Sequence, residues 1–194
     1  MRLPRGGDFS VWKVANHPLR LTLGKRHWQK KPHRFLILGS LLLTLLLVPW
    51  PGIFGALRVS HVQRGRTLLS LPFIFQHPFH LAYTHSIYVT PVVEKFQVTP
   101  SAIRLKEIST YSWGVIEYYG TPGIVREEEG EIRIKEIKFQ VPHFSMMIGF
   151  VGKQELIWKN QTHALYNLAE PGSVLAFEPK DISLARYLWE KVIN

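Results

Sequence analysis

The chain has 194 residues and a net charge of +10, and 46% of its residues are hydrophobic. This hydrophobic fraction excludes an intrinsically disordered chain, and the absence of cysteine excludes disulfide bonds. Residues 1–34 carry nine Lys and Arg against one acidic residue, Asp8, so the charge belongs to an N-terminal segment. Trp28 inside this basic run would suit nucleic-acid binding, but the neighbouring apolar stretch favours a role in membrane topology. We therefore predict a basic cytoplasmic segment over residues 1–34 and no nucleic-acid partner.

An uncharged stretch follows directly, from Phe35 to Leu57. A helix over residues 35–48 alone would be roughly 21 Å long, shorter than the hydrocarbon core of about 30 Å, so a span also needs the residues beyond Pro49. A cleaved signal peptide and an uncleaved signal anchor both remain open. We predict a single-pass transmembrane signal anchor over 35–57. The basic residues before it predict a cytoplasmic N-terminus and an extracytoplasmic body in the cell membrane.

Residues 58–194 predict one all-β domain, an antiparallel sandwich or barrel-like fold with a C-terminal helix. Between Ile134 and Ile137 the apolar positions change phase, which predicts a bulge near Lys135 and Glu136. A helix near 181–193, capped by Asp181, carries an apolar stripe that we expect to pack on the sheet. The acidic run 127–130 is interpreted as a hairpin tip. The predicted strands are 57–62, 67–71, 79–89, 92–99, 103–108, 114–119, 131–139, 145–151, 155–158 and 174–177.

The run from His85 to Glu94 places ionisable side chains on the apolar face of two predicted strands. If Thr90 and Pro91 form a two-residue loop, His85 and Glu94 become diagonal neighbours within side-chain reach. A similar alternation puts Glu107 on the same side, so we predict that the three residues converge. The convergence can be a buried polar network that fixes strand register, a ligand or partner contact, or a metal or acid–base site.

No sequence motif indicates an enzyme. Ser86 follows His85, but adjacent strand residues point to opposite faces, so the pair could act as nucleophile and base only if a bulge intervened. No nucleophile elbow, glycine-rich phosphate loop, His-Glu-x-x-His motif or cysteine pair occurs in the chain. We predict a non-catalytic protein without cofactor or metal. Its candidate contact residues are His85, Ser86, Thr90, Glu94, Glu107 and Trp113.

The pattern of His85-Ser86, Thr90-Pro91-Val92 and Glu94, followed by Trp113-Gly114, resembles an uncharacterised family of small exported prokaryotic proteins. Genes of this family often lie beside TRAP solute transporters of the TAXI subtype, which take up carboxylate-containing solutes. The resemblance covers about Leu57 to Lys180 and implies an extracytoplasmic accessory module that docks the transporter permease or its solute-binding protein. The alternative is a β domain that binds a small ligand or metal through His85, Glu94 and Glu107.

Overall fold

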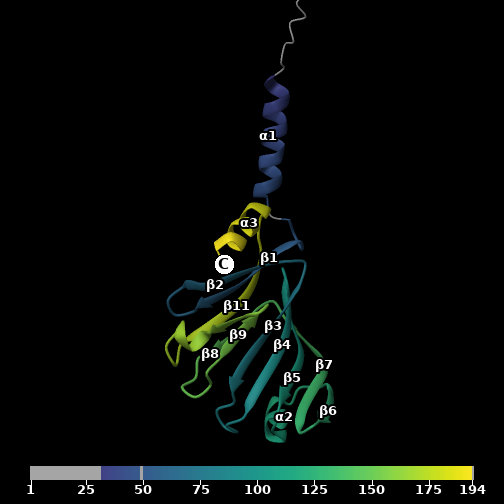
Figure 1. Ribbon diagram of the computed structural model, residues 1–194, viewed down its shortest axis with the longest axis vertical. Helices are drawn as coiled ribbons and strands as arrows, with labels where there is room; N and C mark the ends of the chain where they lie inside the picture. Colours follow the sequence, from purple (N-terminus) through teal and green to yellow (C-terminus); the bar gives the residue numbers. More distant parts are fainter. Residues whose placement is uncertain (1–31, 49, 194) are drawn as a thin grey trace, which may run out of the picture.

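The structure is a computed structural model that describes residues 32–48 and 50–193. Helix α1 (Pro32–Leu47) extends away from a body of two antiparallel sheets, and helix α3 (Leu184–Ile193) lies beside the base of α1 (Figure 1). The prediction of an antiparallel β-sandwich with a C-terminal helix is confirmed. The predicted basic segment lies outside the described residues except for the start of α1.

Two sheets face each other across the core of the described chain. The smaller has the strand order β2-β1-β11-β8, and the larger has the order β10-β9-β3-β4-β5-β7-β6. The smaller sheet consists of β1 (Phe54–His61), β2 (Arg66–Ile74), β8 (Phe144–Met147) and β11 (Val174–Asp181). The larger consists of β3 (His77–Thr84), β4 (Pro91–Thr99), β5 (Ala102–Thr110), β6 (Ile124–Glu128), β7 (Glu131–Val141), β9 (Glu155–Trp158) and β10 (Gln161–Ala164).

A stack of four phenylalanine rings joins the two sheets. Phe79 on β3 lies 5.0 Å from Phe96 on β4, measured between ring centroids, and the interplanar angle is 11°. Phe96 lies 5.2 Å from Phe144 on β8, and Phe144 lies 4.7 Å from Phe177 on β11. Stacked aromatic pairs contribute about 0.5–1.5 kcal/mol beyond the area that they bury. The stack therefore fixes one sheet over the other at the centre of the core.

The expected anchor over residues 35–57 differs from the structure at its C-terminal end. Helix α1 ends at Leu47, and strand β1 begins at Phe54. Ala56 and Leu57 are fully buried in the sandwich core, so they belong to the β domain. Prolines at positions 49 and 51 cannot donate the backbone hydrogen bonds of a continued helix. Within the described residues, no helix combines the length and the hydropathy that crossing a membrane requires.

The predicted strand over residues 114–119 is wrong, because this segment forms helix α2 (Trp113–Tyr119). Gly120 ends the helix in the left-handed conformation, with φ of 55°, and its N–H donates to the carbonyls of Ile116 and Glu117. Val115 and Ile116 suggested a strand but are buried on one side of the helix. The structure also contains β6 and β10, which the sequence did not predict.

Two local predictions on the β6–β7 hairpin are confirmed. Glu129 and Gly130 have positive φ angles of 54° and 80° at the hairpin tip. Glu136 also has a positive φ, 56°, and the pairing of β7 with β5 shifts register there. The shift is the bulge that the phase change between Ile134 and Ile137 predicted.

The C-terminal helix is present and lies against the smaller sheet, but its predicted cap is wrong and much of its apolar stripe is exposed. The Ser183 hydroxyl, rather than Asp181, accepts a hydrogen bond from the backbone N–H of Arg186, at 3.3 Å. Asp181 is the last residue of β11. Helix α3 contacts β1 and β2, and Ile182 at the start of the predicted apolar stripe is buried. Leu188, Trp189, Val192 and Ile193 are exposed, and Glu190 takes the inward position.

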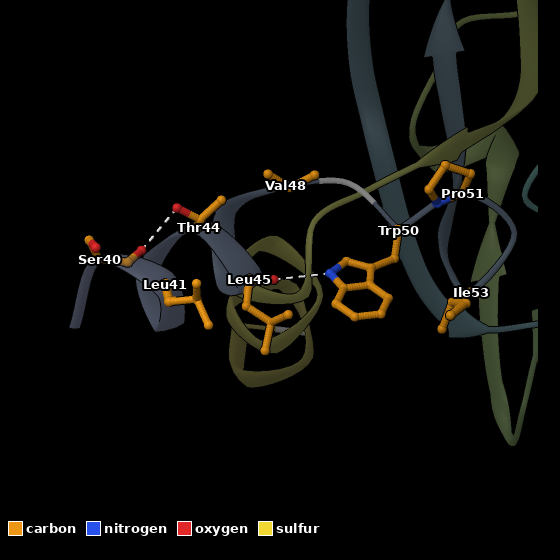
Figure 2. A pocket seen from close by; sticks show the side chains of 8 residues that line it. All are labelled: Ser40, Leu41, Thr44, Leu45, Val48, Trp50, Pro51 and Ile53. Atoms are coloured by element: carbon orange, nitrogen blue, oxygen red, sulfur yellow. Dashed lines mark hydrogen bonds between the residues drawn. The ribbon is translucent and has the colours of Figure 1, made fainter. Parts of the chain in front are cut away.

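The short connection between α1 and β1 forms hydrogen bonds with α1 and with β11. The indole Nε1 of Trp50 donates to the carbonyl of Leu45 in α1 at 3.0 Å (Figure 2). The backbone N–H of Gly52 donates to Oδ1 of Asp181 on β11, also at 3.0 Å. The connection is therefore held at one point by the helix and at a second point by the smaller sheet.

Candidate functional site

The loop between β3 and β4 contains three of the predicted contact residues. It covers residues 85–90, whereas the sequence predicted a two-residue turn at Thr90 and Pro91. As a result, Glu94 pairs with Leu81 and not with Ile87, so the predicted hairpin register is wrong. The longer loop closes when the N–H of His85 donates to the carbonyl of Thr90 at 2.9 Å.

His85 is buried and organises this loop. Its Nδ1 accepts hydrogen bonds from the backbone N–H groups of Ile87 and Tyr88, at 3.3 and 3.5 Å. Its ring lies 5.3 Å from the ring of Tyr88 and 5.0 Å, edge-on, from that of Tyr118 on α2. His85 therefore connects the loop to α2, while its neighbour Ser86 is exposed to solvent.

Glu107 lies on the outer face of the larger sheet, away from Glu94. Opposite β4, Lys95 pairs with Glu107 and Phe96 pairs with Leu105, so β5 has one extra residue here, and this bulge reverses the alternation of inward and outward side chains. The Glu107 carboxylate then pairs with Nζ of Lys95 at 2.7 Å and with Nζ of Lys135 at 3.7 Å. The predicted convergence of His85, Glu94 and Glu107 is therefore wrong. Within the described residues, no three His, Asp or Glu side chains are placed to hold a metal ion together.

Glu94 does lie on the inner face of β4, and two tyrosines meet it there. The Tyr83 hydroxyl, from β3, donates to Oε1 of Glu94 at 2.9 Å. The Tyr119 hydroxyl, from the end of α2, contacts the same oxygen and the Tyr83 hydroxyl. The sequence did not predict that either tyrosine lies beside Glu94. Tyr83 shared the apolar face of its strand, but Tyr119 was assigned to a strand that does not form.

These three side chains line a cavity of about 300 Å³, which we call the Glu94 pocket. Its remaining walls are mostly apolar and come from both sheets. A larger cavity of about 440 Å³ lies at the base of α1, but no ionisable side chain lines it. The walls of the Glu94 pocket include Leu81, Phe96, Leu105, Phe139, Phe144 and Met146, with Thr121 and Ser145 as further polar members.

The pocket favours the protonated forms of its titratable groups. Burial raises the pKa of Glu94 above its ordinary value, although the hydrogen bonds from Tyr119 and Tyr83 lower it in part. Burial, reinforced by the negative charge of Glu94, raises the pKa of Tyr83 and that of Tyr119 above their ordinary range. Both tyrosines are therefore neutral hydrogen-bond donors at physiological pH.

One oxygen of Glu94 is available to a molecule in the pocket. Both tyrosine contacts go to Oε1, and no residue in the described part of the chain donates a hydrogen bond to Oε2. No Lys or Arg in that part forms an ion pair with Glu94. A carboxyl group in an apolar cavity without a cationic partner can accept a hydrogen bond or take the charge of a bound cation.

A comparison with protein families matches residues 79–165 to a domain of unknown function (DUF1850). Over this segment, the chain is similar to an uncharacterised domain family. The segment includes the loop at 85–90, helix α2 and every residue that lines the Glu94 pocket. Neither the curated proteins nor the solved structures give a match. The sequence resemblance to an uncharacterised family is thus confirmed, and the pocket lies inside the matched segment.

Proposed function

We propose that this protein is a membrane-anchored, extracytoplasmic β domain that binds a small amphiphilic molecule in the Glu94 pocket. The observation that carries the proposal is the placement of Glu94, Tyr83 and Tyr119 in the wall of an otherwise apolar cavity. Small-molecule sites typically combine apolar walls with a few convergent polar groups that fix the orientation of the ligand. The proposal gives this site a binding role without catalysis.

The chemistry of the pocket supports a ligand with a cationic or hydroxyl end. An amine would place its positive charge beside Glu94 and supply the partner that the carboxylate lacks within the described chain. A carboxylate ligand would meet like charge when Glu94 is ionised, and the hydroxyls of Tyr83 and Tyr119 already engage Oε1. A cavity of about 300 Å³ suits a ligand built around one aromatic ring. The proposed ligand is therefore different from the carboxylate solutes of TAXI transporters.

The exposed apolar surface of α1 supports the anchoring part of the proposal. Large apolar side chains are exposed all around the helix, including Phe35 at 74% and Leu41 at 67%. A contiguous apolar surface of this extent marks a site that another apolar medium covers. The basic residues that precede α1 in the sequence favour a cytoplasmic N-terminus and a body outside the cell.

A set of three matched compounds tests the ligand class. Phenethylamine, 2-phenylethanol and phenylacetate share one ring and differ in the charge of the end group. With the full chain in lipid nanodiscs, saturation-transfer NMR is expected to show the strongest binding for the amine and the weakest for the carboxylate. Glu94→Gln is expected to abolish the preference for the amine, because the amide cannot become negatively charged.

Glu107→Gln is the matched control, since it makes the same chemical change on the outer face of the sheet. We expect this variant to keep the preference for phenethylamine. Equal binding of all three compounds to the native chain would overturn the proposed ligand class. Equal losses in the Glu94 and Glu107 variants would overturn the placement of the site.

A second candidate function, docking of a TRAP transporter component, is favoured by exposed aromatic side chains at and around α2. Helix α2 lies at the end of the molecule opposite α1 (Figure 1). The surface of these side chains, the distal patch, combines α2 with the loop at 85–90. Gly114 permits the contact between them, because a Cβ at this position would lie 2.5 Å from the Tyr88 ring. Exposed aromatic side chains are typical of protein interfaces. The distal patch consists of Ile87, Tyr88, Val89, Tyr111, Trp113 and Tyr118, all exposed.

Co-purification from native membranes tests the docking hypothesis. The tagged full chain is expected to recover the permease or the solute-binding protein, and the double variant Trp113→Ala, Tyr118→Ala is expected to lose it. Aromatic hot spots commonly contribute 2 kcal/mol or more, roughly a thirtyfold loss of affinity each. Tyr166→Ala removes an exposed tyrosine elsewhere and serves as the control. Recovery of neither component by the native chain would contradict the hypothesis.

A further inference from the structure

Helix α3 presents its polar side to the domain and its apolar side to the surroundings. Glu190 is only 4% exposed, and its Oε2 accepts a hydrogen bond from the Ser70 hydroxyl of β2 at 2.9 Å. Its Oε1 accepts one from Nε of Arg186, one turn earlier, at 2.7 Å. On the same side, the ring of Tyr187 lies 5.3 Å from that of Phe54. These contacts fix the rotation of α3 about its own axis.

The opposite face of α3 is apolar and exposed. Leu188 and Val192 are four residues apart, so they lie on one face of the helix, and Val192 is 83% exposed. Trp189 and Ile193 extend this face and are 66% and 60% exposed. An amphipathic helix on a water-soluble domain would turn such a stripe inward. The inward polar contacts of Glu190 prevent that rotation, so the stripe must be covered from outside.

The surroundings of α3 indicate what covers the stripe. Helix α3 contacts α1, whose large apolar side chains are exposed as well, and both lie at the same end of the molecule (Figure 1). Between α1 and the start of β1 lies the cavity of about 440 Å³, open along the helix and lined by Leu41, Leu45, Val48 and Ile53 (Figure 2). The apolar surface is thus continuous from α1 to the domain.

We propose that α3 lies in the membrane interface, with Leu188 and Val192 among the lipid chains and Glu190 on the side of the domain. The proposal rests on the anchoring of α1 in the same bilayer. An interfacial helix buries its apolar face about 5–10 Å into the boundary between headgroups and acyl chains, and Trp189 has the amphipathic ring typical of that boundary.

Spin labels on single cysteines test this proposal directly, and the native chain contains no cysteine that would interfere. The full chain is reconstituted in vesicles of phosphatidylcholine and phosphatidylglycerol, with one nitroxide at Val192→Cys. Collisions with oxygen, which concentrates in lipid, are compared with collisions with a water-soluble nickel chelate. Leu41→Cys on α1 is the reference for lipid, and Tyr118→Cys in the distal patch is the reference for water.

The label at position 192 is expected to resemble the label at position 41, with strong oxygen relaxation and weak nickel relaxation. If position 41 is in lipid and position 192 is open to nickel, the interfacial helix is wrong while the anchoring stands. If position 41 itself is open to nickel, the anchoring fails and this inference fails with it. Shielding of position 192 from both reagents would show a protein partner or a second copy there and would also overturn the proposal.

Discussion

Replacing Phe177 by alanine is expected to lower the free energy of unfolding by about 3–5 kcal/mol. The ring is fully buried and stacks on Phe144 at 4.7 Å, at the end of the series of rings that joins the two sheets. Its removal leaves a cavity that the rigid sheets can fill only in part. Denaturant unfolding of the full chain in detergent, followed by tryptophan emission, to which buried Trp158 contributes, measures the loss.

Phe150→Ala provides the matched control, because this phenylalanine is 88% exposed. Its effect is expected to stay within about 0.5 kcal/mol, the range of ordinary surface substitutions. Phe177→Leu keeps most of the side-chain volume and should lose clearly less stability than Phe177→Ala. If Phe177→Ala and Phe150→Ala proved equally mild, the stack would not be the link between the sheets.

Replacing Glu94 by glutamine is expected to stabilise the protein at about pH 8 and to change little at about pH 4. Below the ordinary glutamate pKa, the carboxyl group is protonated in both the folded and the unfolded chain. As the pH rises toward the raised folded-state pKa, the unfolded chain ionises first, so the native protein loses stability. Each unit between the two pKa values corresponds to about 1.4 kcal/mol. Glutamine keeps an oxygen acceptor for Tyr83 and Tyr119 but cannot ionise.

Unfolding curves of the native chain and of Glu94→Gln across this pH range measure the difference. The two proteins should coincide at acidic pH and diverge as the pH rises. Glu107→Gln should show no stabilisation at high pH, since the native carboxylate is paired with Lys95 and Lys135. A gap between native and Glu94→Gln that stays constant with pH would contradict the assigned rise in the pKa of Glu94.

The sequence located Glu94 correctly on the inner face because β4 keeps a regular alternation there. Val92, Phe96 and Val98 are buried on the same face, as the period of two requires. The bulge in β7 was also predictable, since the spacing between Ile134 and Ile137 breaks that period. The alternation of apolar and polar residues within one strand was therefore enough to predict the face of Glu94 and the bulge in β7.

The arrangement around Glu94 could not be predicted in the same way. In β5, the spacing of Leu105 and Ile108 allowed either face for Glu107, and the bulge opposite Lys95 and Phe96 of β4 decided the outer one. Helix α2 contains strand-forming Val115 and ends at a left-handed glycine, and this helix delivers Tyr119 to the pocket. Contacts between distant segments thus built the site, and a periodic pattern does not encode such contacts.

The two hydrogen bonds of the connection between α1 and β1 have a mechanical consequence. Trp50 is hydrogen-bonded to Leu45 of α1, and Gly52 is hydrogen-bonded to Asp181 of β11. These two bonds couple the helix mechanically to the sandwich. A tilt of α1 is therefore expected to tilt the sandwich with it, so the orientation of the helix sets the height of the Glu94 pocket above the surface that holds α1. A molecule that binds in the pocket has to reach it at that height.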